Sequence, residues 1–121
     1  MRVFVDTSSI VFALSNRKDP LAGIREGLPG CEIVIPSGVL GELKGIGSGT
    51  GKFAKHANAG LALISGAHVT VASSNGNVDD WLVGSVKPGE EAVCTNDMKL
   101  KERLKNKGIT VFSISRTGAL R

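Results

Sequence analysis

Two patterns of apolar residues alternate along the chain. Some segments are apolar at consecutive positions, as in Val3-Phe4-Val5 and Ile33-Val34-Ile35, which is typical of strands buried on both faces of a parallel sheet. Other segments carry apolar residues at helical spacing, as Ala57, Leu61 and Ile64 do. The first pattern predicts strands at residues 2–5, 32–35, 68–72, 91–94 and 109–114. The second pattern, together with capping signals, predicts helices at residues 10–14, 20–27, 38–46, 52–65, 80–83 and 97–107.

The predicted strands alternate with predicted helices throughout the chain, and this order is typical of a parallel sheet covered by helices on both faces. A chain of 121 residues has room for one domain, and it shows neither a linker nor an internal repeat. We therefore predict a single α/β domain over residues 1–121, built as a three-layer sandwich. The residues after 114 are expected to be loose.

The charge of the chain is unevenly distributed. The net charge is +4, but the segment from Asp97 to the end holds seven Lys and Arg residues and two acids, a balance of +5. This segment indicates either a polyanionic partner or a solvated, lysine-rich helix. Aromatic residues make up only 4% of the chain and Tyr is missing, which disfavours recognition of nucleic acid by a stacked aromatic platform.

Cysteine content and hydropathy give expectations about the compartment. Cys31 and Cys94 are too few for a disulfide scaffold, and each lies in an apolar run that favours a buried thiol. No apolar run approaches the roughly 18–20 residues of a membrane helix, and the apolar stretch after Met1 is too short for a secretory signal. We therefore expect a cytoplasmic protein with no membrane partner.

Acidic residues lie close to the ends of the predicted strands. Asp6 directly follows the first strand, and Asp97 comes shortly after the fourth. Glu42 lies one turn into the helix after the second strand, and Asp79 and Asp80 begin the helix before the fourth. Because ligands bind beyond the carboxyl ends of the strands in open α/β sheets, we expect these acids to converge.

The chemistry of these acids favours a hard divalent cation such as Mg²⁺, since no His or Cys pair shows the spacing of a zinc site. Such cations can activate water and stabilise the leaving oxygen of a phosphodiester. Each acid also has a structural explanation. Asp6 and Asp97 could cap the helices that follow them, Glu42 could be a surface charge, and the Asp79-Asp80 pair could complement a helix dipole.

A resemblance to a known family extends over four segments, residues 3–8, 35–43, 78–83 and 93–104. The last segment, which contains Thr95-Asn96-Asp97, is the most specific. In these segments the chain resembles the PIN domain, the nuclease fold of VapC-type toxins and of endonucleases that process ribosomal RNA. The resemblance implies a five-stranded parallel sheet in the order 3-2-1-4-5, with Asp6 and Asp97 where the strand order reverses. It also places the first strand between Cys31 and Cys94, which argues against a disulfide.

The resemblance implies a ribonuclease that uses Mg²⁺ or Mn²⁺ to hydrolyse RNA. The acids expected to bind metal and act in catalysis are Asp6, Glu42, Asp80 and Asp97, with Asp80 favoured over Asp79 by the match to the family pattern. The residues expected to support the site are Thr7, Ser8, Asp79, Thr95 and Asn96. The residues expected to contact the RNA backbone are Lys52, Lys55, Lys99, Lys101 and Arg103.

The same resemblance leaves a second functional interpretation open, a PIN-fold RNA-binding or assembly protein with weak or no catalysis. The full set of acids favours the endoribonuclease. The candidate protein partners that the resemblance suggests are a cognate antitoxin, a ribosomal assembly factor and a second copy of the chain.

Overall fold

Five parallel strands form the central sheet of the computed structural model, which describes residues 1–121. The strands are β1 (Arg2–Val5), β2 (Glu32–Pro36), β3 (Thr70–Ala72), β4 (Glu91–Cys94) and β5 (Thr110–Phe112). The helices are α1 (Thr7–Ser15), α2 (Pro20–Gly27), α3 (Ser37–Gly47), α4 (Lys52–Ser65), α5 (Val78–Ser85) and α6 (Met98–Asn106). The predicted α/β fold is therefore confirmed. No helix of this structure has both the length and the hydropathy that a membrane span requires.

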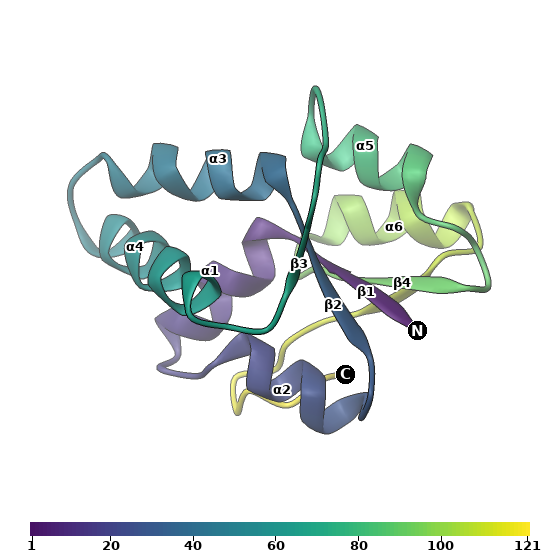
Figure 1. Cartoon of the computed structure of the whole chain (residues 1–121), viewed down its shortest axis with the longest axis horizontal. Coiled ribbons are helices and arrows are strands. Elements are labelled where there is room, and N and C mark those ends of the chain that lie inside the picture. Colours follow the sequence, from purple (N-terminus) through teal and green to yellow (C-terminus); the bar gives the residue numbers. More distant parts are fainter.

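The strand order is β3-β2-β1-β4-β5, as the resemblance implied. Strand β1 lies at the centre, where Val3 is paired with Ile33 of β2 and with Ala92 of β4, and all three side chains are buried. In Figure 1, α5 and α6 lie together over one side of the sheet and α2 lies on the other, while α3 and α4 extend away as a pair. The strand order reverses between β1 and β4, so the carboxyl ends of these two strands flank the crevice where ligands bind in such sheets.

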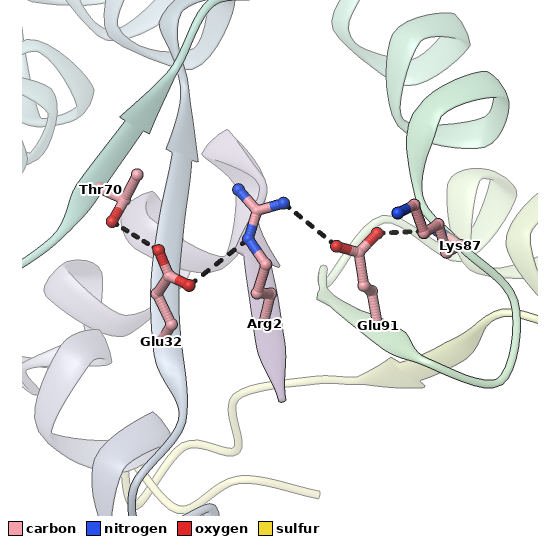
Figure 2. A network of polar contacts seen from close by, with 5 residues as sticks. All are labelled: Arg2, Glu32, Thr70, Lys87 and Glu91. Atoms are coloured by element: carbon pink, nitrogen blue, oxygen red, sulfur yellow. Dashed lines mark hydrogen bonds and ion pairs between the residues drawn. The ribbon is translucent and has the colours of Figure 1, made fainter.

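The amino ends of the strands are joined by a network around Arg2 (Figure 2). The Arg2 guanidinium contacts Glu91 on β4 at 3.2 Å and Glu32 on β2 at 3.5 Å, and Glu32 accepts a hydrogen bond from Thr70 on β3. The buried Glu91 carboxylate also accepts the backbone N–H of Lys87 at 2.9 Å. This network links four neighbouring strands at their amino ends, and the predicted acids lie near the opposite, carboxyl ends of the strands.

The prediction that the last residues are loose is wrong. The backbones of Ser113 and Arg121 exchange two hydrogen bonds of 2.8 and 2.9 Å, and Ile114 pairs with Leu120 in an antiparallel bridge. The tail also packs directly on α2, because a Cβ at Gly23 would collide with a backbone carbonyl of the tail. The predicted fifth strand ends at Phe112, two residues early, and the chain turns back at residues 116–118.

Candidate active site

A cavity of about 650 Å³ opens at the carboxyl ends of the central strands. Four carboxylates from separate parts of the chain line it, together with two hydroxyls and a short apolar wall, and neither Lys nor Arg is among the lining residues. Its lining residues are Asp6, Thr7, Ser8, Val11, Glu42, Gly45, Ile46, Asp79 and Asp97. The acids that follow β1, β2 and β4 therefore line the same cavity.

Asp6 is buried and held by two hydroxyl groups. Its Oδ2 accepts hydrogen bonds of 2.9 Å from Ser8 Oγ and from Thr95 Oγ1. The same hydroxyl oxygens accept the backbone N–H groups of Asn96, at 3.0 Å, and Asp97, at 3.1 Å. Both hydroxyl hydrogens are therefore directed at one oxygen of Asp6, and the other oxygen, Oδ1, accepts no protein hydrogen bond. Asp6 does not cap α1 through its side chain, because these contacts hold its carboxylate elsewhere.

Asp97 and Glu42 are held in the same manner through one oxygen each. Asp97 Oδ1 accepts the backbone N–H groups of Lys99 and Leu100 at 2.9 and 3.2 Å, so it caps α6, as the structural explanation anticipated. Glu42 accepts a hydrogen bond from the Thr7 hydroxyl through Oε1. The second oxygen of each carboxylate has no protein donor. Asp97 therefore caps α6 with one oxygen and keeps its other oxygen without a protein donor at the cavity.

Asp79 experiences the electrostatic field of the other acids. Burial raises the pKa of Asp79 above its ordinary value, and the carboxylates of Asp6, Asp97 and Glu42 raise it further, while the Arg103 guanidinium opposes them. The cavity is therefore a region of concentrated negative charge that a cation would relieve.

The structure places Asp79 at the cavity, whereas the sequence favoured Asp80 as the acid of the site. Asp80 does not line the cavity, its side chain is 69% exposed, and it pairs with Arg103 at 2.8 Å. The reason is the rotation of α5, whose buried residues Val78 and Leu82 define its inner face. At about 100° per residue, Asp79 lies about 80° from the centre of that face and Asp80 about 180° from it.

The donors around the cavity fit a hydrated, oxygen-preferring cation. No three His, Cys, Asp or Glu side chains lie close enough together to hold one ion directly. Mg²⁺, however, keeps several waters and is commonly held by one or two carboxylates, which suits acids spread around a cavity. A zinc site is not supported, because neither His nor Cys lines the cavity.

Comparison with known proteins identifies the family. A family profile described as a PIN-like domain matches residues 3–117. The chain belongs to the PIN-like domain family. No curated protein sequence matches it. The structure of the PIN domain endonuclease Utp24 is similar, with a TM-score of 0.81 and 24% identity over 99% of this chain and 89% of that one.

Two further solved structures share the PIN-like fold. A domain of a functionally unknown protein from Methanocaldococcus jannaschii has a TM-score of 0.63 and 21% identity, covering 94% of this chain and 91% of that one. VapBC2 from Rickettsia felis, bound to a DNA fragment from its promoter, has a TM-score of 0.61 and 17% identity, covering 93% and 98%. At these identities the likeness concerns the fold.

The residues predicted to support the site of this PIN-like domain lie on two sides of it. Thr7 and Ser8 line the cavity, and Thr95 lies directly behind Asp6. Asn96 faces away, where its side chain exchanges hydrogen bonds of 3.0 and 2.8 Å with the backbone of Ile114. Asn96 thereby ties the end of β4 to the tail of the chain.

Four residues around the site were not anticipated from the sequence. Ser9 donates a hydrogen bond of 2.9 Å to Asn96, and Val11, Gly45 and Ile46 form the apolar wall of the cavity. The sequence contained a signal for two of them. Val11 and Ile46 each come one helical turn after a polar residue that lines the cavity, Thr7 and Glu42 respectively.

The basic residues predicted to contact RNA all lie outside the lining of the cavity. Lys99 and Lys101 border a hollow along α6. Arg103 is paired with Asp80 at the surface. Lys52 and Lys55 are exposed on the first turn of α4, where the Lys52 ammonium lies 5.9 Å from the centre of the Phe53 ring.

Proposed function

We propose that this PIN-like domain is an endoribonuclease that hydrolyses RNA with the help of Mg²⁺ or Mn²⁺. The observation that carries the proposal is the state of three carboxylates. Asp6, Glu42 and Asp97 each have one oxygen fixed by protein donors and one without a donor, at a cavity with no lining Lys or Arg. Side chains held in this way are oriented before a cation arrives, which lowers the cost of binding it.

The proposed roles follow from position. A hydrated cation would be held among Asp6, Glu42, Asp79 and Asp97, by one or two of these carboxylates directly and by the others through its bound waters. When bound, it would supply the activation of water and stabilise the leaving oxygen of the phosphodiester. The hydroxyls of Ser8 and Thr95 keep Asp6 in place, and the Thr7 hydroxyl keeps Glu42 in place. The backbone N–H groups at the start of α6 keep Asp97 in place.

The basic residues of α4 and α6 would bind the RNA backbone away from the acids. Lys52, Lys55, Lys99 and Lys101 are exposed or half-exposed and carry no ion pair, so they are available to phosphate groups. Each phosphate contact should lower the affinity by about 0.7 log unit for each log unit of salt, as for single strands. An affinity that does not change with salt would contradict this part of the proposal.

The adjacent acids of α5 provide a matched test of catalysis. Cleavage of a labelled RNA with Mg²⁺ or Mn²⁺ is compared for the wild type, Asp6→Asn, Asp97→Asn, Asp79→Asn and Asp80→Asn. The first three variants should lose more than about a hundredfold in rate, because even residues that only orient metal ligands contribute about 10–100-fold. Asp80→Asn should cleave like the wild type. Equal rates in all five proteins would overturn the proposal.

A second candidate is a PIN-fold RNA-binding or assembly protein without catalysis. The observation in its favour is that no three acids lie close enough together to hold one ion directly. This candidate predicts RNA binding without cleavage and a melting temperature that millimolar Mn²⁺ leaves unchanged. The endoribonuclease predicts stabilisation by the cation, about 2.7 kcal/mol at 100 times its dissociation constant. An antitoxin, an assembly factor and a second copy of the chain are the proposed protein partners in either case.

A further inference from the structure

The cavity has two chemically different ends, and both are formed by the same pair of helices. On α1, Thr7 is followed four residues later by Val11, and on α3, Glu42 is followed four residues later by Ile46. Thr7 and Glu42 meet through a hydrogen bond. One turn further along each helix, about 6 Å away, the lining is Val11 and Ile46. The cavity therefore passes from carboxylates to aliphatic side chains over one helical turn.

Packing inside the protein accounts for Val11, which lies against the hydrophobic core, but leaves Ile46 at the surface. Ile46 is 37% exposed although it is a large aliphatic residue, and Val11 is only partly buried. Gly45 precedes Ile46 on α3 and also lines the cavity, and a Cβ added there would meet no atom within 4 Å. The space beside Gly45 is thus open, and it belongs to the same cavity as the acids, with two aliphatic side chains and a glycine as its lining at this end.

We propose that the wall formed by Val11, Gly45 and Ile46 binds the unpaired base of the nucleotide whose phosphate lies at the acids. This inference rests on the proposed function and adds to it a subsite for the base, formed by residues that lie beside the acids. A nucleobase is a flat group with an apolar face, and it is separated from its own phosphate by a ribose, which matches the distance between the two ends. A cavity of about 650 Å³ is of the size that small-ligand sites commonly have.

The first test measures the NMR resonances of methyl groups and does not depend on catalysis. A nucleoside monophosphate is titrated into the protein with Mg²⁺ present, and ribose 5-phosphate serves as the control without a base. Ring currents of the base should shift the Val11 and Ile46 methyl resonances, and ribose 5-phosphate should leave them unshifted. Equal shifts with both compounds, or no shift with either at millimolar concentration, would overturn the proposal.

A matched pair of variants on one helix tests the open space. Gly45→Leu fills the apolar end, and Gly41→Leu adds the same side chain one turn earlier. A Cβ at Gly41 also meets no atom within 4 Å, but Gly41 does not line the cavity. Gly45→Leu should weaken nucleotide binding by about tenfold, the equivalent of about 60 Å² of apolar contact at about 25 cal/mol/Å². Gly41→Leu should bind like the wild type, and equal binding by the two variants would refute the assignment.

The same variants separate this proposal from the nuclease proposal. The wild type should cleave an RNA with an abasic nucleotide at the cleaved position more slowly than the intact RNA. The Gly45→Leu variant should cleave the two RNAs at the same low rate, because its base site is filled. Base-dependent methyl shifts in a protein that cleaves no RNA would retain the base site and reject catalysis. Cleavage of intact and abasic RNA at equal rates would retain catalysis and reject the base site.

Discussion

Thr95 connects two of the acids at the cavity, because its hydroxyl donates to Asp6 and accepts the backbone N–H of Asp97. Its side chain is fully buried. The substitution Thr95→Val keeps the size and the β-branch of the residue but removes both hydrogen bonds. It therefore isolates the contribution of one hydroxyl to the position of both carboxylates.

The cost of Thr95→Val can be worked from these contacts. Loss of a hydrogen bond to a charged carboxylate contributes about 1.5–3 kcal/mol, and the half-buried N–H of Asp97 adds about 1 kcal/mol when it loses its acceptor. The additional methyl group restores about 0.8 kcal/mol of apolar burial. The free energy of unfolding should fall by about 2–3 kcal/mol, which a domain of ordinary stability tolerates without unfolding.

The assay is urea unfolding followed by circular dichroism, with Thr95→Ser as the control. Thr95→Ser keeps the hydroxyl and loses one buried methyl group, so it should cost only about 1 kcal/mol. In the cleavage assay, Thr95→Val should lower the rate by about 10–100-fold, whereas Thr95→Ser should remain near the wild type. If Thr95→Val were at least as stable as Thr95→Ser and cleaved RNA like the wild type, the hydroxyl would not be what holds Asp6.

Three further predictions concern titratable and charged groups. Because the fold raises the pKa of Asp79, its ionised form destabilises the protein, and this penalty develops as the pH rises from the ordinary value of 3.8 through the folded-state pKa. Asp79→Asn should therefore raise the melting temperature at pH 7 without metal, and the difference from the wild type should shrink as the pH falls towards 3.8. Burial raises the pKa of the Cys94 thiol to about 11. At pH 8, iodoacetamide should therefore alkylate the half-exposed Cys31 before Cys94, which peptide mass spectrometry measures, and the reverse order would contradict this prediction. Arg2→Met leaves the buried Glu91 without its ion pair and should lower the free energy of unfolding by about 1–2 kcal/mol in urea titrations, with no change in the cleavage rate of the folded protein; an unchanged midpoint would show that the pair contributes nothing.

The sequence by itself determined the elements and their order, because their signals are local. Consecutive apolar residues mark strands β1 and β2, and Asp97 marks the start of α6 through its cap. Position near the ends of the predicted strands already identified all four acids that line the cavity, and the resemblance to the PIN family supplied the strand order. The rotation of α5 was also within reach of the sequence, since Val78 and Leu82 turn Asp80 outward and leave Asp79 beside the cavity.

Only the tertiary structure decided what holds and surrounds these acids. The bond from Thr95 to Asp6 and the bond from the Asn96 N–H to Ser8 depend on the pairing of β1 with β4, which sets Val5 beside Cys94. The apolar wall needs α1 and α3 to lie next to each other, and the ordered tail needs α2 beneath it. Hydrogen bonds and contacts between residues that are distant in the chain depend on register and helix placement, and no local pattern of residues encodes either.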